Sequence, residues 1–158
     1  MKFVKQGVRE CVLATLAMLA DVDIETARDA AADVAGVPRE RFVWFPFFDD
    51  FPEDLPRRQY ARDVAKKLQL LISPITYSGL TPSSGPPYDL SGRGQVNAEF
   101  KYGGGHSAAY EDGLVYDPNE DGQGESLEEY LKRLGDSAAG DVVRVIIARL
   151  EGRYEGDE

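Results

Sequence analysis

An almost wholly apolar run near the start of the chain limits what this sequence can fold into. Residues 11–20, Cys-Val-Leu-Ala-Thr-Leu-Ala-Met-Leu-Ala, carry one thiol, one hydroxyl and otherwise small or aliphatic side chains. Alanine, leucine and methionine favour a helix, and a helix that is apolar on every side has to be buried on every side. The run therefore predicts a helix that begins near Glu10 or Cys11, ends near Leu19 or Ala20, and lies at the centre of a domain.

Length and composition fit one globular domain with a single core. The chain has 158 residues, of which 42% are hydrophobic, as is ordinary for such a domain. We expect this domain to span residues 1–152 and an acidic tail to follow over residues 153–158. No segment approaches the roughly 20 apolar residues of a membrane span, and the first five residues lack the apolar region of a secretion signal. No membrane partner is expected.

Charge and cysteine content narrow the function classes further. The formal net charge is -10, with 28 acidic and 18 basic residues, which disfavours nucleic acid as a partner because phosphates require a basic surface. Solubility alone explains an acidic surface, although such a surface would also attract basic substrates. A single cysteine and a single histidine exclude an internal disulfide and argue against structural zinc. We expect a cytoplasmic protein without metal or cofactor.

Capping signals predict two more helices in the first half of the chain. Asp23 suits the N-cap of a helix over residues 24–34, which the segment Gly36-Val37-Pro38 would end. Pro56 suits the first turn of a helix over residues 57–70.

Two segments of the chain are candidate walls of a binding groove. Residues 42–51 are rich in phenylalanine and tryptophan and are interrupted by proline. They form either a hydrophobic cluster beneath a loop or an aromatic wall of a ligand site. Residues 78–94 are rich in glycine, proline and serine, which predicts a long exposed connection and a candidate second wall.

Alternating and β-branched segments in the second half predict an antiparallel sheet. The expected strands cover residues 95–102, 106–110, 114–117 and 141–150. Asp112-Gly113 is typical of a hairpin turn, and Ser126 with Glu129 forms a capping box for a helix over residues 127–134. Helices first and strands second indicate an α+β fold, with N-terminal helices packed on a C-terminal antiparallel sheet.

The only cysteine and the only histidine lie in contexts that suit nucleophilic catalysis. Cys11 stands where the buried helix should begin, and a helix N-terminus stabilises a thiolate through its partial positive charge and free N–H groups. A thiolate is the nucleophile of thiol hydrolases, and a histidine is the usual group that takes and returns the proton. His106 follows the glycines at 103–105, which allow backbone to approach a site closely.

Two further residues complete a candidate site. Asp117 lies across the predicted hairpin from His106, where a carboxylate would orient the imidazole and stabilise the imidazolium. Asn119 is the alternative third member, whereas Glu111 and Asp112 are better explained as turn residues. The side-chain amide of Gln6, with the backbone N–H of the cysteine, would stabilise the negative charge that acyl transfer places on a carbonyl oxygen.

These motifs, in this order, resemble a known family. They are Gln6, the segment Cys-Val-Leu-Ala-Thr-Leu-Ala-Met at 11–18, Gly-His-Ser-Ala at 105–108 and Val-Tyr-Asp-Pro-Asn at 115–119. Together they resemble the papain-like cysteine peptidases, most closely the bacteriocin-processing (double-glycine leader) peptidases and their stand-alone relatives in bacteria and phages. The resemblance spans most of the chain and implies a papain-like fold.

The resemblance also implies a role for each residue. Cys11 would be the nucleophile, His106 the base and acid, Asp117 the orienting carboxylate and Gln6 the oxyanion donor. The chain departs from the family at residues 10–12, where Glu-Cys-Val replaces the usual Asp-Cys-Gly. Gln6 also lies one residue closer to the cysteine than the family's glutamine does. These departures concern the substrate and the oxyanion donor more than the fold.

Each motif taken alone has an ordinary structural explanation. A lone cysteine in an apolar helix is usually a small buried hydrophobe, a lone histidine is usually structural or merely exposed, and Asp-Pro usually ends a strand. Because all of them occur in one expected order, we predict a cysteine peptidase that acts on a peptide or protein through a thioester. The alternatives are an amidase, deamidase or acyl-transfer enzyme with the same triad, or an inactive peptide-binding module. Substrate specificity and oligomeric state stay open.

Overall fold

The protein has an α+β fold, as the sequence predicts. The computed structural model describes residues 1–7, 9–42, 54–73, 77–80, 90–101, 104–136 and 142–153. Its helices are α1 (Cys11–Leu19), α2 (Ile24–Ala35), the short 3-10 helix η1 (Arg39–Arg41), α4 (Asp54–Lys67) and α5 (Leu127–Gly135). Its strands are β1 (Leu70–Ile72), β2 (Tyr77–Leu80), β3 (Arg93–Phe100), β4 (Gly105–Glu111), β5 (Leu114–Tyr116) and β6 (Val142–Arg153). In this described part of the chain, no helix combines the length and apolarity needed to cross a membrane.

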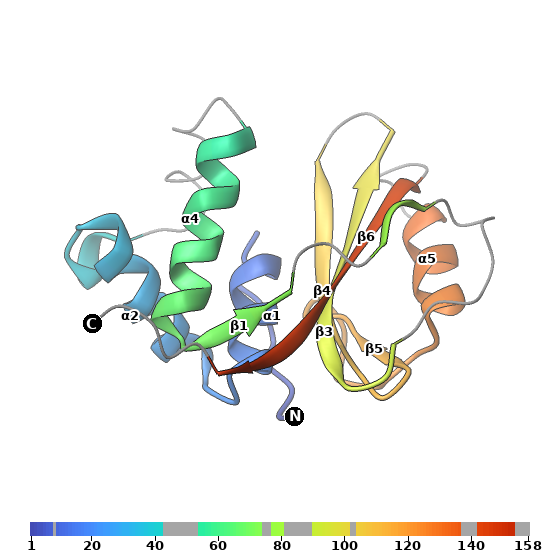
Figure 1. Cartoon of the computed structure of the whole chain (residues 1–158), viewed down its shortest axis with the longest axis horizontal. Coiled ribbons are helices and arrows are strands. Elements are labelled where there is room, and N and C mark those ends of the chain that lie inside the picture. Colours follow the sequence, from blue (N-terminus) through green and yellow to red (C-terminus); the bar gives the residue numbers. More distant parts are fainter. Residues whose placement is uncertain are drawn as a thin grey trace.

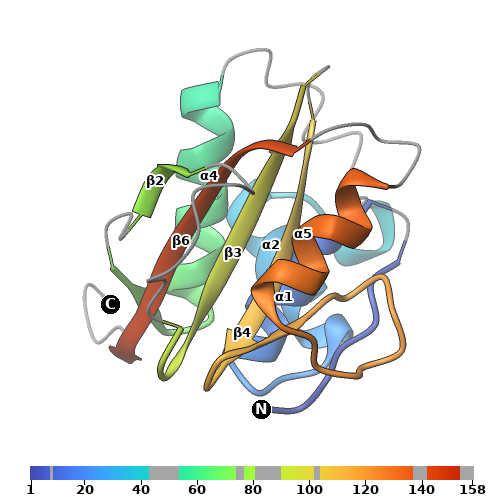
Figure 2. The same cartoon turned by 90° about the vertical axis from the view of Figure 1, so that its right-hand side faces the viewer.

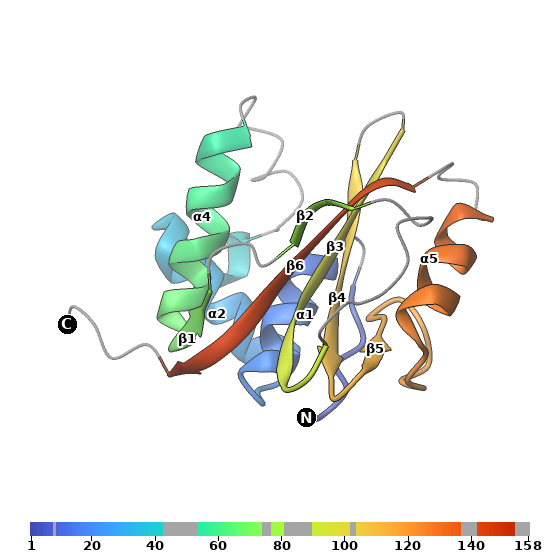
Figure 3. The same cartoon turned by 45° about the vertical axis from the view of Figure 1, so that its right-hand side comes forward.

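The described strands form one antiparallel sheet in the order β1-β6-β3-β4-β5. The long strand β6 pairs with β3 along one side, while β1 and β2 share its other side (Figure 3). Its β-branched run therefore occupies an interior position, as the sequence predicts. Strand β6 continues to Arg153, and residues 154–158 of the expected tail lie outside the described part.

Helices cover both faces of the sheet, and each face has its own core. Helices α1, α2 and α4 lie on one side and α5 lies on the other (Figures 1 and 2). Strand β4 contributes to both cores because side chains alternate along a strand: Ala109 packs with the α1 side, and Ala108 and Tyr110 pack with the α5 side. All residues of α1 from Leu13 to Leu19 are buried, which confirms the predicted central helix.

Local signals explain where the elements begin and end. The Asp23 side chain accepts a hydrogen bond from the Thr26 N–H at 2.8 Å and caps α2, and Gly36 ends that helix in the left-handed conformation. Asp112 and Gly113 both have positive φ, 49° and 90°, as the tight turn between β4 and β5 requires. These three predictions are confirmed.

Other boundaries differ from the prediction. Residues 77–80 form β2, and β3 begins at Arg93, so part of the predicted connection over 78–94 belongs to the sheet. The reason is that β2 forms backbone hydrogen bonds with β6 on the side of that strand that does not face β3. Leu90, expected in an exposed connection, is buried against the α5-side core. Helix α4 begins at Asp54 rather than at 57. Of the aromatic segment, Phe42 is buried, and residues 43–51 lie outside the described part. Residues 81–89 of the predicted connection also lie outside it.

Gly94 is a position where the sheet leaves no room for a side chain. A Cβ there would lie 2.3 Å from the Ala148 carbonyl oxygen and 2.4 Å from the ring of Tyr110. Both neighbours are held, one as backbone and the other as a fully buried ring. We expect Gly94→Ala to lower the free energy of unfolding by about 2–3 kcal/mol, measured by urea denaturation.

Gly135 is the matched control for that substitution. It ends α5, and an added Cβ would meet nothing within 4 Å. Alanine favours a helix over glycine by up to about 1 kcal/mol, so Gly135→Ala should be neutral or slightly stabilising. Equal urea midpoints for the two variants would contradict the packing described for Gly94.

Candidate active site

Cys11 lies at the first residue of α1, on the border between core and solvent. It is partly exposed, whereas the helix behind it is buried. The Thr15 hydroxyl donates to the Cys11 carbonyl oxygen at 2.7 Å. The N-cap residue makes no side-chain hydrogen bond to the helix. The helix N-terminus therefore presents a thiol from a rigid, buried support.

A partly buried ion pair holds the turn that leads into Cys11. The carboxylate of Glu10 accepts from Arg28 Nη2 at 2.6 Å and Nε at 2.9 Å, and from the Gly7 N–H at 3.1 Å. A Cβ on Gly7 would lie 2.2 Å from Glu10 Oε1 and 2.9 Å from Arg28 Nη2, so a larger residue here would displace the side chains of this ion pair. The pair ties the turn to α2. This pair was not predicted from the sequence, although a charged residue directly before a buried helix indicates that a partner is required.

His106 reaches the site from the start of β4. Gly104 has a φ of 75°, and a Cβ on Gly105 would lie 2.8 Å from the Ala98 carbonyl oxygen. These contacts explain why residues 104 and 105 are glycines, because the chain turns sharply at Gly104 and Gly105 then pairs closely with β3. The side chain of His106 is 14% exposed, so the imidazole is largely shielded from water.

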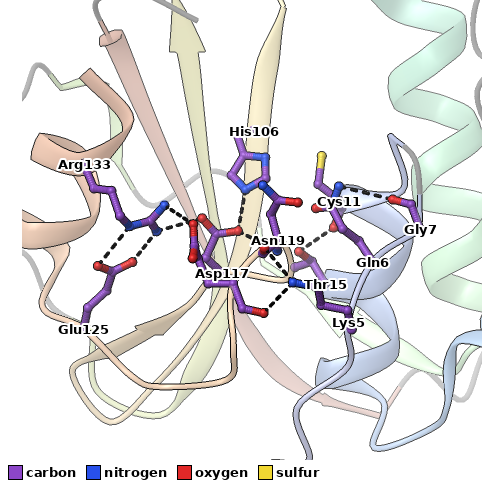
Figure 4. Close-up of polar contacts among 11 residues, drawn as sticks. Lys5, Gln6, Gly7, Cys11, Thr15, His106, Asp117, Asn119, Glu125 and Arg133 are labelled. Atoms are coloured by element: carbon purple, nitrogen blue, oxygen red, sulfur yellow. Dashed lines mark hydrogen bonds and ion pairs between the residues drawn. The ribbon is translucent and has the colours of Figure 1, made fainter. Parts of the chain in front are cut away.

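The imidazole of His106 lies between a carboxylate and the thiol. Its Nε2–H donates to Asp117 Oδ1 at 2.6 Å, which leaves Nδ1 for Cys11, whose sulfur lies beside the ring (Figure 4). Burial by itself would lower the pKa of His106. The hydrogen bond to Asp117 and the hydrogen-bonding and charge interactions with Cys11 outweigh burial and raise this pKa to about 9. The imidazolium is therefore the favoured form near neutral pH.

Asp117 is deeply buried, with 2% of its surface exposed. Its Oδ1 also accepts from the Asn119 N–H at 2.9 Å, and its Oδ2 accepts from Arg133 Nη2 at 2.8 Å. Burial would raise the pKa of Asp117, but His106, this backbone N–H and the guanidinium together hold the pKa below its usual value. The carboxylate is therefore ionised and fixed in orientation.

The arm that carries Gln6 is joined to the loop after β5. The Gln6 N–H donates to the Pro118 carbonyl oxygen at 2.9 Å, and Lys5 Nζ donates to the carbonyl oxygens of Asn119 and Glu120 at 2.7 and 2.9 Å. Gln6 Nε2 donates to the Gly7 carbonyl oxygen at 3.3 Å, and its amide points toward Cys11 (Figure 4). Its Oε1 is buried without a hydrogen-bond partner.

The structure brings the four predicted residues together from separate segments. The carboxylate of Asp117 bonds the imidazole, whereas Asn119 supplies its backbone N–H to that carboxylate. Two further residues of the site, Arg133 and Tyr130, were not predicted from the sequence; they lie on α5 beside Asp117 and His106 respectively. Their spacing of three residues predicts that they share one face of a helix, but it does not predict which part of the protein packs against that face.

The site brings together a thiol, an imidazole and a carboxylate. Among the residues that the structure describes, no group of three or more His, Cys, Asp or Glu side chains could hold a metal ion. No protein-family model, curated protein or solved structure matches this chain.

Proposed function

We propose that this protein is a papain-like cysteine hydrolase that cleaves peptide bonds in a peptide or protein. The observation that carries the proposal is the meeting of the only cysteine with the only histidine. A buried carboxylate also bonds the other ring nitrogen at 2.6 Å. Nucleophile, base and orienting group in this relation are the functional unit of thiol hydrolases.

The arrangement of the elements supports a papain-like fold. The nucleophile begins a central helix, the histidine begins a strand of an antiparallel sheet, and the carboxylate follows the next strand. Helix and sheet each supply part of the site. The resemblance described for the sequence places these residues in the same order.

The proposed reaction begins with attack by the Cys11 thiolate on the carbonyl carbon of the substrate amide. A C–S bond forms, and the carbonyl π electrons move to the oxygen. When the intermediate collapses, the C–N bond breaks and the His106 imidazolium gives its proton to the leaving amine. The neutral imidazole then takes a proton from water, whose oxygen attacks the thioester. Cleavage of the C–S bond releases the acid and restores the thiolate and imidazolium.

Two N–H groups are available for the oxyanion. The backbone N–H of Cys11 is at the N-terminus of α1, where it has no partner within the helix. One N–H of the Gln6 amide is bonded to the Gly7 carbonyl oxygen, which leaves the second for the substrate. A donor of this kind typically stabilises the transition state by about 2.7–4 kcal/mol.

Alkylation of the thiol tests the proposal without knowledge of the substrate. Because Cys11 is the only cysteine, one carbamidomethyl group in the mass spectrum reports only this site. We expect iodoacetamide at about pH 6 to label the folded protein at least ~10-fold faster than the same chain unfolded in guanidinium chloride, because the neighbouring imidazolium supports the thiolate. A folded protein that reacts no faster than the unfolded chain would contradict the proposal and favour a binding module.

Product analysis identifies the acceptor of the acyl group. Incubation with a peptide library should give shortened peptides with free carboxyl ends, read by mass. Added amines should not be incorporated if water is the acceptor. Incorporation of the amine, or loss of side-chain ammonia without backbone cleavage, would instead identify acyl transfer or deamidation with the same triad.

A further inference from the structure

Arg133 on α5 holds the oxygen of Asp117 that His106 does not use. Its Nη2 donates to Asp117 Oδ2 at 2.8 Å, while His106 occupies Oδ1 at 2.6 Å (Figure 4). One buried carboxylate is therefore shared between two positively charged groups. Each of them reduces the negative charge available to the other.

Other side chains keep Arg133 in this position. Its guanidinium also bonds Glu125, through both Nε and Nη2, and bonds Glu120 at 2.9 Å. Glu125 is fixed by two backbone hydrogen bonds with Val115, at 2.7 and 3.0 Å. The guanidinium carbon lies 5.7 Å from the centre of the Tyr130 ring. Arg133 is thus held by contacts that are independent of the imidazole.

Three elements supply the ionisable groups around His106. Cys11 comes from α1, Asp117 from the loop after β5, and Tyr130 from α5, with ring centres 6.4 Å apart for the histidine and the tyrosine. Burial raises the pKa of Tyr130 well above its usual range, so this phenol stays neutral. The charge on the imidazole is therefore governed by the thiol and by Asp117, and through Asp117 by Arg133.

We propose that Arg133 is a positioning residue that shares the Asp117 carboxylate with His106 and thereby limits how strongly the imidazolium is held. A general acid has to release its proton to the leaving amine, and a group that is held too firmly in its charged form does this poorly. Arg133 would keep Asp117 ionised and oriented while leaving His106 able to give up its proton. This inference rests on the proposed function.

Titration of the single histidine tests the inference directly. With 15N-labelled full-length protein, long-range 1H–15N NMR spectra follow the ring nitrogens of His106 alone. We expect Arg133→Gln to raise the measured pKa by roughly half a pH unit or more, because Asp117 and Glu125 lose their shared cation. Arg133→Lys, which keeps the charge, should stay close to the unmodified protein. A merely structural role for Arg133 would leave the pKa unchanged or lower it.

Glu125→Gln provides a milder second variant if Arg133→Gln fails to fold. Removing this carboxylate leaves more of the guanidinium charge for Asp117, so the pKa of His106 should fall. Arg93→Gln is the matched control for charge. Arg93 on β3 also bridges two carboxylates, those of Asp21 and Glu111. Glu111 ends β4, about 17 Å along that strand from His106. The Arg93→Gln substitution should therefore leave the titration of His106 unchanged.

The outcomes separate this inference from the proposed function. Prompt alkylation of Cys11, together with an unchanged or lowered pKa of His106 in Arg133→Gln, would overturn the role of Arg133 and leave the hydrolase intact. Slow alkylation of Cys11 in the unmodified protein would overturn the hydrolase itself. A raised pKa in Arg133→Gln, restored in Arg133→Lys, supports the inference.

Discussion

Replacing Cys11 by alanine is expected to abolish peptide hydrolysis, with a loss of about 10⁵–10⁶-fold in turnover. The proposed reaction has no other nucleophile. His106→Ala should have a similar effect, because the same imidazole both supports the thiolate and protonates the leaving group. Initial rates on a defined peptide mixture, followed by mass spectrometry, measure the loss.

The fold should survive the Cys11 substitution. Cys11 is partly exposed, so removal of one sulfur leaves only a small cavity, and the unfolding free energy should change by less than about 1 kcal/mol. Val12→Ala is the matched control, since it shortens the next side chain of the same helix without touching the proposed chemistry. If Cys11→Ala keeps full activity while Val12→Ala loses it, the proposed mechanism is wrong.

Replacing Asp117 by asparagine is expected to reduce turnover by about 10²–10⁴-fold with little change in overall structure. The amide has nearly the same shape as the carboxylate, but it carries no charge and favours the wrong imidazole tautomer. The pKa of His106, about 9 in the unmodified protein, should fall because its main charged partner is gone. NMR titration of the histidine measures this fall, and an unchanged pKa would contradict the role of Asp117.

The same substitution should change how stability depends on pH. The pKa of His106 is raised on folding from an ordinary value near 6.5. Its stabilisation is therefore complete below pH 6.5 and is lost as the pH rises through about 9. The difference in unfolding free energy between the unmodified protein and Asp117→Asn should thus be larger at pH 6 than at pH 10. Urea denaturation at the two values measures it, and the remainder at pH 10 reflects the lost contact with Arg133.

Asp117 contributes in the opposite pH range. Its pKa is lowered on folding, so its stabilisation is present above its ordinary pKa and is lost as the pH falls through the folded value. The advantage of the unmodified protein over Asp117→Asn should therefore also decrease under strongly acidic conditions. The two groups together predict that the advantage is greatest at mildly acidic to neutral pH.

Much of the fold follows from local patterns in the sequence. The apolar run of α1 requires burial, Asp23 caps α2, and Asp112-Gly113 turns β4 into β5. Each of these depends on residues within a few positions of one another, which is why they are readable from the chain. Strand β2 was not predicted, because it exists through its pairing with β6, far away in the sequence.

The candidate site divides in the same way. Sequence order and context suggested Cys11, His106, Asp117 and Gln6, because each stands in a recognisable local setting. The choice between Asp117 and Asn119 as partner of the imidazole depended on hydrogen-bond geometry in the folded chain.

What the sequence determined by itself is the central helix with a thiol at its head and the strands that follow it. Only the tertiary structure decided which charged partners support the site: Arg28 for Glu10, the residue before the thiol, and Arg133 for Asp117, behind the imidazole. The physical reason is that propensity, capping and turn chemistry act between neighbours in the chain. The partner of a buried charge is set by which faces of distant elements pack together.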